Sequence, residues 1–129
     1  MGSLRLDGSI TCLSLDGPAD AQTFGAFLQK ALCPTLRPGD VVVLDNLSAH
    51  KSQLALRLIR QAGAHVRFLP AYSPDLNPIE KMWSKVKASL RSAEARTPDT
   101  LGQAITAALA GVTPRDALNW FASCGYSFI

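Results

Sequence analysis

Residues 41–45 read Val-Val-Val-Leu-Asp, and this short run decides which fold the rest of the chain is expected to adopt. Four consecutive apolar residues without polar alternation are typical of a strand that is covered on both faces. A helical pattern that Ser48 can cap follows, and a second short strand is expected at 66–69. Strand, helix and strand in this order predict a parallel, right-handed crossover unit. Asp45 then ends a central strand, at the edge where open α/β sheets place their sites.

The segment before this run predicts a hairpin and a helix. Two short strands at 4–6 and 10–15 flank Asp7-Gly8, a dipeptide that favours tight turns. Asp16, Gly17 and Pro18 should stop the second strand, and the apolar spacing through 20–32 predicts an amphipathic helix.

The segment after it predicts a proline-rich loop and three helices. Asn77 and Pro78 form a cap-then-proline start for a helix that runs to about Leu90. Thr97-Pro98 and Thr113-Pro114 open two more helices with the same signal.

Length and composition limit the class of protein. A chain of 129 residues with 47% apolar and 18% charged residues fits one packed α/β domain, residues 1–129. The net charge of +3 suits a polyanionic partner without requiring one. No apolar run is long enough for a membrane span, and three widely spaced cysteines predict reduced core thiols in a soluble cytoplasmic protein.

Two acidic residues carry the chemistry that the sequence predicts. Asp45 ends a strand and Glu80 opens a helix, so both carboxylates can converge on one edge of a sheet. Carboxylate oxygens are the ligands that Mg²⁺ prefers, and paired divalent ions catalyse phosphoryl transfer. Five basic residues nearby are candidates for contacts with a DNA backbone: Lys51, Lys81, Lys85, Lys87 and Arg91.

The residues around these acids carry a family resemblance. Residues 42–46 read Val-Val-Leu-Asp-Asn, and residues 72–80 read Tyr-Ser-Pro-Asp-Leu-Asn-Pro-Ile-Glu. With thirty-four residues between Asp45 and Glu80, the chain resembles the DDE transposases of the mariner superfamily, in their bacterial insertion-sequence branch. Trp83 and Lys87 extend the likeness into the helix.

The resemblance implies a fold, a cofactor and a partner. The fold is an RNase H-like (retroviral integrase-like) mixed sheet flanked by helices. Asp45 matches the second metal ligand and Glu80 the third, for two Mg²⁺ or Mn²⁺ ions in a complete site. The family's first strand, which carries the first catalytic aspartate, has no matching position, so we expect an N-terminally truncated catalytic domain. The implied partners are transposon ends and target DNA, in a bacterial, nucleoid-associated protein.

Each site residue also has a plainer interpretation. Glu80 stands three residues after Asn77, so the two can form a capping box that would compete with metal binding. Asn46, His50 and Asn77 are candidates for positioning a phosphate or a metal-bound water, but Asn46 can instead form an Asx-turn and His50 can be a surface residue. The basic residues of the 78–90 helix can be merely its solvated face.

Two functions remain open from the sequence. The first is a DDE transposase catalytic-domain fragment for metal-dependent DNA strand cleavage and transfer, weak or inactive alone unless an upstream transposase chain supplies the first aspartate. The alternative is a non-catalytic transposase remnant that acts as a DNA-binding or self-associating module. Because a missing edge strand exposes pairing groups, we expect a homodimer or a strand-exchanged oligomer.

Overall fold

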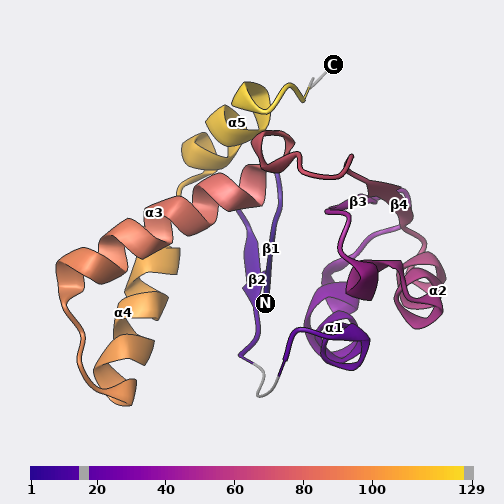
Figure 1. The fold of residues 1–129 in the computed structure, drawn as a ribbon. Coiled ribbons are helices and arrows are strands. Elements are labelled where there is room, and N and C mark those ends of the chain that lie inside the picture. The colour runs from indigo at the N-terminus through magenta and orange to yellow at the C-terminus, as the bar shows by residue number, and fades with distance from the viewer. Residues whose placement is uncertain (15–17, 127–129) are drawn as a thin grey trace. The chain divides into compact units, whose positions relative to one another are not determined.

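The strands and helices of the protein form the mixed α/β architecture that the sequence predicts (Figure 1). The structure is a computed structural model, and it describes residues 1–14 and 18–126. Its contacts divide the chain into two units: unit 1 is Met1–Ser3 with Thr11–Pro74, and unit 2 is Leu4–Ile10 with Asp75–Ile129. Each unit is described by itself.

Unit 1 is built on a parallel pair of strands, β3 (Val41–Leu44) and β4 (His65–Phe68). The register pairs Val41 with His65 and Leu44 with Phe68, and the amide of Leu69 continues the ladder to the Leu44 carbonyl at 2.8 Å. The parallel crossover is confirmed. Because the two parallel strands end at the same edge of the sheet, the residues after Leu44 and the residues after Phe68 lie close together.

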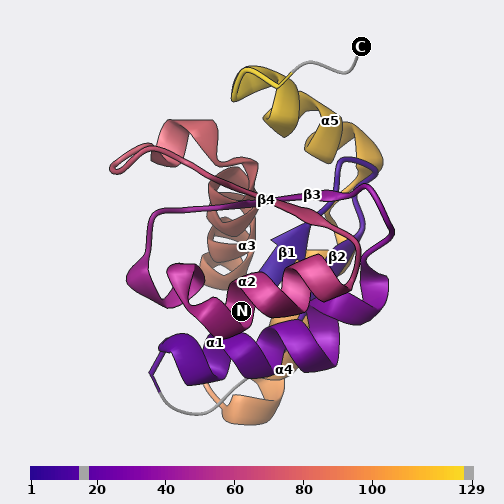
Figure 2. The same ribbon diagram turned by 90° about the vertical axis from the view of Figure 1, so that its right-hand side faces the viewer.

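The position of β3 corrects one expectation. Within the part of the chain that the structure describes, β3 pairs with β4 alone, so it is not a central strand. Helices α1 (Ala21–Phe27) and α2 (Gln53–Gln61) both lie on one side of the pair (Figure 2). Val41 is 56% exposed whereas Leu44 is 8% exposed, so the strand is not covered on both faces. An apolar run predicts a strand, but it does not predict which elements cover the faces of that strand.

The first helix of unit 1 agrees with its predicted range, 20–32, but only its first part is α-helical. α1 opens with a capping box in which the Asp20 carboxylate accepts from the Thr23 amide at 2.9 Å. The chain continues as a π-helix, η1 (Leu28–Leu32), and a 3₁₀ turn, η2 (Cys33–Thr35), before Pro38. Its buried side chains form the core of unit 1 with residues of α2 and β3: Phe24, Phe27, Leu28, Leu32, Leu44, Ala55, Ile59 and Ala64.

The second helix of unit 1 begins later than expected. Ser48 does not cap it; residues Ser48–Lys51 form a separate 3₁₀ turn, η3, and α2 starts at Gln53. Ser52 is the N-cap, because its Oγ accepts from the Ala55 amide at 3.2 Å. Gly63, with φ of +84°, follows the end of the helix in a left-handed conformation.

The predicted hairpin is present but shifted toward the N-terminus. Its strands are β1 (Gly2–Leu4) and β2 (Ile10–Cys12). The turn is closed by the Ser9 amide, which donates to Asp7 Oδ1 at 2.9 Å, and by the Gly8 amide, which donates to the Arg5 carbonyl at 3.0 Å. The predicted end of the second strand at Leu15 and the stop at Asp16 and Gly17 lie outside the described residues.

Unit 2 consists of the hairpin turn, Leu4–Ile10, and three helices. The 3₁₀ turn η4 (Pro74–Leu76) leads into α3 (Pro78–Ala93), which is followed by α4 (Pro98–Ala110) and α5 (Pro114–Ser123). Thr97 and Thr113 cap α4 and α5 with capping boxes, as the threonine-proline pairs predict. Met82 and Val86, which lie one turn apart on α3, are buried and form the apolar stripe of this helix.

Two expectations from composition can be checked. Over the described ranges, no helix is both long and apolar enough to cross a membrane. The three cysteines are free thiols, of which Cys124 is buried and Cys33 is half-buried, but Cys12 is exposed and is therefore not a core residue.

Candidate active site

Asp45 lies at the carboxyl end of β3, directly after the buried Leu44. Its Oδ1 atom accepts a hydrogen bond from the Leu47 amide at 3.1 Å, which makes an Asx-turn. The sequence suggested an Asx-turn at Asn46 as one alternative, but the residue that forms the Asx-turn is Asp45. Asn46 itself is exposed beside the carboxylate, and Lys51 is exposed at the end of η3.

His50 points back from η3 to the same carboxylate. Its Nδ1 lies 2.6 Å from Asp45 Oδ1. The contact is short but not aligned as a hydrogen bond, and Nδ1 is buried without any other polar partner in the described part of the chain. Asp45 is therefore a close neighbour of this nitrogen but does not satisfy its hydrogen-bonding capacity. The alternative of a free surface histidine does not hold, since its side chain is 19% exposed.

The far side of the His50 ring lies on an aromatic residue of α1. The ring centroids of His50 and Phe24 are 4.3 Å apart with an interplanar angle of 43°, and Phe24 is 4% exposed. Phe24 was not a predicted site residue. The sequence offered no signal beyond its place in the apolar stripe of a helix, because the contact with His50 is tertiary.

Glu80 lies in the first turn of α3 and is exposed. Asn77 has the extended backbone of an N-cap, but its side chain makes no capping hydrogen bond, and the capping box that would have engaged Glu80 is not formed. Proline at the first helical position removes one amide donor from that turn. Among the described residues the Glu80 carboxylate makes no hydrogen bond or ion pair, so capping does not compete with metal binding for this side chain.

The basic residues of α3 fall into two groups. Lys81 Nζ donates to Ser123 Oγ at 2.7 Å, while Lys85 Nζ donates to Asp116 Oδ2 at 2.5 Å and to the Gly111 carbonyl at 2.9 Å. The hydrogen bond from Lys85, together with one from the Thr113 amide, lowers the pKa of the Asp116 carboxyl below its ordinary value of 3.8. These two lysines therefore tie α3 to α5.

The second group is free to meet an anion. Lys87 and Arg91 are exposed, one turn apart on α3, and neither has an ion pair among the described residues. Residues four positions apart lie on the same face of a helix, so both cations project in one direction.

The donor set fits a divalent cation only in part. Asp45 offers Oδ2, a hard oxygen without a partner in the described ranges, and Asp45 belongs to unit 1 while Glu80 belongs to unit 2. Across residues 1–14 and 18–126, no group of three or more His, Cys, Asp or Glu side chains could hold a metal ion. Asp45 can thus serve as one ligand, but no complete ligand set is formed.

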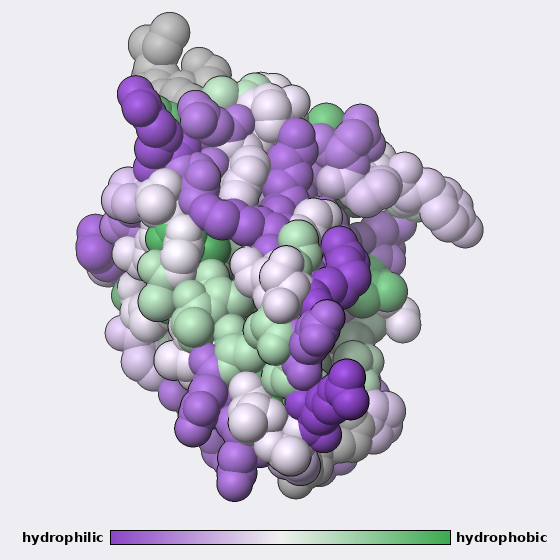
Figure 3. Space-filling view, turned by 90° about the vertical axis from the view of Figure 1, so that its left-hand side faces the viewer, coloured by the Kyte–Doolittle hydropathy of each residue, from purple (hydrophilic) through white to green (hydrophobic). Residues whose placement is uncertain are grey.

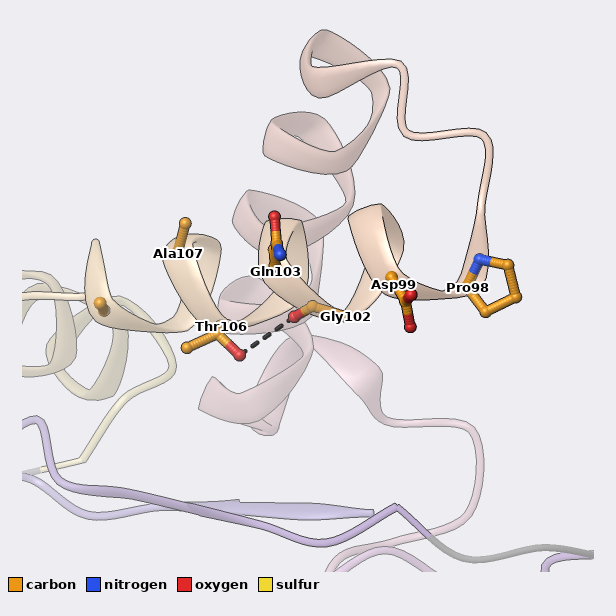
Figure 4. Close-up of a pocket in the computed structure, with 7 residues that line it drawn as sticks. Pro98, Asp99, Gly102, Gln103, Thr106 and Ala107 are labelled. Carbon is orange, nitrogen blue, oxygen red and sulfur yellow. Dashed lines mark hydrogen bonds between the residues drawn. The ribbon is translucent and has the colours of Figure 1, made fainter.

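A surface hollow on α4 is a poor candidate for the site. It is lined by one face of that helix, with Pro98, Asp99, Gly102, Gln103, Thr106 and Ala107 labelled in Figure 4, where Thr106 Oγ1 donates to the Gly102 carbonyl at 3.0 Å. Figure 3, which views the side of α3 and α4, shows apolar side chains gathered between polar ones. Asp99 is the one ionisable residue of the hollow's lining, so it lacks the groups that chemistry on a phosphodiester needs.

Comparison with known proteins gives one positive finding. A family profile described as DDE superfamily endonuclease matches residues 1–102, which include Asp45 and Glu80. No curated protein matches the chain.

Proposed function

Because the chain belongs to the DDE superfamily endonuclease family, we propose that it is part of a transposase catalytic domain for metal-dependent cleavage and transfer of DNA strands. The branch proposed is the bacterial insertion-sequence branch of the mariner superfamily, acting on transposon ends and target DNA of the nucleoid in the cytoplasm. The proposed fold is a single RNase H-like domain to which both units belong.

The observation that carries the proposal is the state of the Asp45 carboxylate. It stands at the end of a parallel strand, the position that α/β folds use for catalytic groups. Oδ1 is held by the Leu47 amide and faces His50, while Oδ2 has no partner within the described residues. An aspartate that only ends a turn does not require a histidine beside its carboxylate.

Divalent ions would supply the activation of the attacking hydroxyl and the stabilisation of the leaving oxygen. In this proposal Asp45 and Glu80 each contribute a hard oxygen ligand, and Asn46, His50 and Asn77 orient ligands or a phosphate around them. These residues make an incomplete set, since the resemblance requires a third carboxylate. We therefore expect weak or no strand cleavage by this chain alone, unless further sequence or an upstream transposase chain supplies that group.

DNA would meet the basic residues that the fold leaves unpaired. Lys87 and Arg91 are exposed on one face of α3, and Lys51 is exposed on η3 beside the Asp45 turn. Lys81 and Lys85 were candidates of equal rank in the sequence. Their contacts with Ser123 and Asp116 support a smaller share in phosphate binding for these two residues.

Calorimetric titration of Mn²⁺ tests the proposal most directly. We expect saturable binding by the wild type, no binding by Asp45→Asn, and weakened binding by Glu80→Gln. Asp99→Asn, which removes an acid from the α4 hollow, is the matched control and should bind as the wild type does. No heat from the wild type, or equal binding by Asp45→Asn, would rule out a metal site at this carboxylate.

A second candidate is the non-catalytic remnant, a self-associating or DNA-binding module, and one observation favours it. One edge of β3 is unpaired in the described part of the chain, and Val41 on that strand is 56% exposed. Such an edge is stabilised by pairing with a second copy of the chain. Light scattering should then give a dimer that Val41→Lys converts to monomer, while Leu118→Lys on α5, an apolar position that is 45% exposed, leaves it intact. A monomeric wild type contradicts this candidate.

A further inference from the structure

The longest stretch of the chain without an acidic residue lies between Asp45 and Asp75, in unit 1. Residues 46–74 contain neither aspartate nor glutamate. The lysines and arginines of this stretch are all exposed: Lys51, Arg57, Arg60 and Arg67. A helix surface that only has to be solvated usually mixes charges of both signs, whereas a surface with cations alone attracts polyanions. The stretch therefore indicates a surface for an anionic partner.

Two of these cations share the outer face of α2. Arg57 and Arg60 are three residues apart, so their side chains project on the same side of the helix. Gln53 and Gln61 lie four residues before and four residues after Arg57 and extend this side in both directions. All four side chains are exposed, and together they are called the basic face of α2. The opposite side of the helix packs in the core of unit 1, where Ile59 is fully buried.

Neither arginine of the basic face is neutralised within the described residues. No acid there forms an ion pair with Arg57 or Arg60, and no hydrogen bond holds either guanidinium group. Two acids of unit 1 are engaged by backbone amides instead: Asp20 caps α1, and Asp40 accepts from the Arg37 amide at 2.8 Å. Both arginines can thus bind an anion without first losing an ion pair.

We propose that the basic face of α2 is a contact surface for the phosphate backbone of duplex DNA. The inference rests on the proposed function, which supplies DNA as the partner. It adds a surface in unit 1 that is separate from the cations of α3 in unit 2.

The direction of α2 connects the basic face with the edge at which Asp45 lies. Because β3 and β4 are parallel, the crossover helix between them runs back against the strands and begins at the edge where β3 ends. Gln53 is therefore nearest to that edge, with Lys51 before it, and Arg60 is farther along the helix. A DNA strand that passes Asp45 can follow the basic face along α2.

The spacing of the two arginines suits neighbouring phosphates. Three residues of helix separate Arg57 and Arg60 by about 4.5 Å along the axis. One strand of B-DNA carries a phosphate about every 3.4 Å of the duplex axis, and the long arginine side chains can bridge the difference. A guanidinium group can donate two hydrogen bonds to one phosphate, and the amides of Gln53 and Gln61 add donors without charge.

An anionic lipid surface also attracts cations, but it suits α2 less well. Helices that bind membranes lay their apolar side into the headgroup region. In α2 that side carries Ala55 and Ile59, which are both 0% exposed, and Leu58, which packs on the same core. Since the basic face has no apolar side chain to insert, nucleic acid is the polyanion that this surface fits.

The experiment is a salt titration of DNA binding by the full chain, followed by fluorescence anisotropy of a short duplex of random sequence. Arg57→Gln and Arg60→Gln should each reduce the slope of log affinity against log salt concentration by about 1, and the double variant by about 2. Glutamine has nearly the helix propensity of arginine, so α2 should remain folded. Lys30→Gln is the matched control, because Lys30 is an exposed cation of unit 1 that lies on η1; it should leave the slope unchanged.

Gln53→Glu separates loss of contact from loss of stability. A glutamate at the first position of α2 interacts favourably with the helix dipole, so the melting temperature should not fall. The added negative charge should nevertheless weaken DNA binding several-fold. Gln29→Glu, at an exposed position on η1, adds the same charge outside the basic face and should bind DNA as the wild type does.

Chemical modification gives a second readout. Phenylglyoxal should modify Arg57 and Arg60 more slowly when the duplex is bound, as measured by mass spectrometry, and Arg91 should be protected under the proposed function. Protection of Arg91 without protection of Arg57 and Arg60 overturns the inference and leaves the proposed function intact. A wild type that does not bind DNA overturns both. If the double variant keeps its DNA affinity but loses binding to phosphatidylserine vesicles, the basic face serves a lipid surface and the inference is wrong.

Discussion

Gly8→Ala should destabilise the protein far more than a glycine-to-alanine change usually does. Gly8 lies in the hairpin turn with φ of +91°, and a Cβ atom built there would be 2.9 Å from Pro114 Cα and 3.0 Å from Pro114 N. Both contacts are with backbone atoms at the start of α5, so no side chain can swing away to relieve them.

The magnitude follows from two separate terms. Left-handed backbone costs an L residue about 1–2 kcal/mol, of which alanine recovers about 0.4–1 kcal/mol by restricting the unfolded chain. Overlap with a packed backbone adds about 1–3 kcal/mol when the structure has to shift. Gly125 shares the φ of +91° and the unit but has nothing within 4 Å of its Cβ position, so Gly125→Ala carries the first term alone. We expect a loss of about 2–4 kcal/mol for Gly8→Ala and of about 1 kcal/mol for Gly125→Ala.

Urea unfolding followed by tryptophan fluorescence is a suitable assay. Both tryptophans of the chain, Trp83 and Trp120, belong to unit 2, which also contains Gly8 and Gly125. The free energy of unfolding is obtained from the transition midpoint and its slope. Equal losses in the two variants would show that the turn does not approach Pro114, and the reasoning about the packing of unit 2 would then be wrong.

Three further predictions concern a helix start, a charged face and an acid transition. Ser52→Ala should lower the free energy of unfolding by about 1 kcal/mol, whereas Ser48→Ala should leave it unchanged, because Ser52 alone caps α2; equal losses in urea melts contradict the cap assignment. Lys87→Gln should reduce the slope of log affinity for duplex DNA against log salt concentration by about 1, and Lys85→Gln should change this slope little, as measured by fluorescence anisotropy. A larger change for Lys85→Gln would refute the distinction between paired and unpaired lysines of α3. Folding lowers the pKa of Asp116, so the stability that its carboxylate contributes is complete above the ordinary value of 3.8 and is lost as the pH falls below it. Asp116→Asn should therefore flatten the fall of the melting temperature between about pH 5 and pH 2. An acid transition that is unchanged in Asp116→Asn would contradict this role of Asp116.

The sequence predicted best those features that are decided by a few adjacent residues. Thr97 and Thr113, each followed by proline, start α4 and α5 as expected, because an N-cap depends on the residue and the amide three positions later. The start of α2 was missed for the same local reason. Ser48 and Ser52 are both able to cap, and only the 3₁₀ turn at Ser48–Lys51 decides in favour of the second.

Features that depend on distant residues were beyond prediction. The apolar run at 41–44 specified a strand but not its neighbours, so the pairing with β4 alone and the exposure of Val41 did not follow from it. The motif marks Asp45 as a candidate ligand and His50 as one of two alternatives, and both roles stay predictions. Phe24 was not predicted at all, since twenty-five residues separate it from His50 and nothing in its own helix distinguishes it from Phe27.

The two candidate metal ligands differ in how far the fold has prepared them. Asp45 is held at Oδ1 by the Leu47 amide and lies in contact with His50, so its side chain would lose little freedom if it bound a cation. Glu80 is exposed and lacks the capping box that would have fixed it. A flexible glutamate side chain loses up to about 2 kcal/mol of rotamer freedom when it is fixed. Under the proposed function, Asp45 would therefore be a preorganised ligand, whereas Glu80 would have to be ordered when a cation binds.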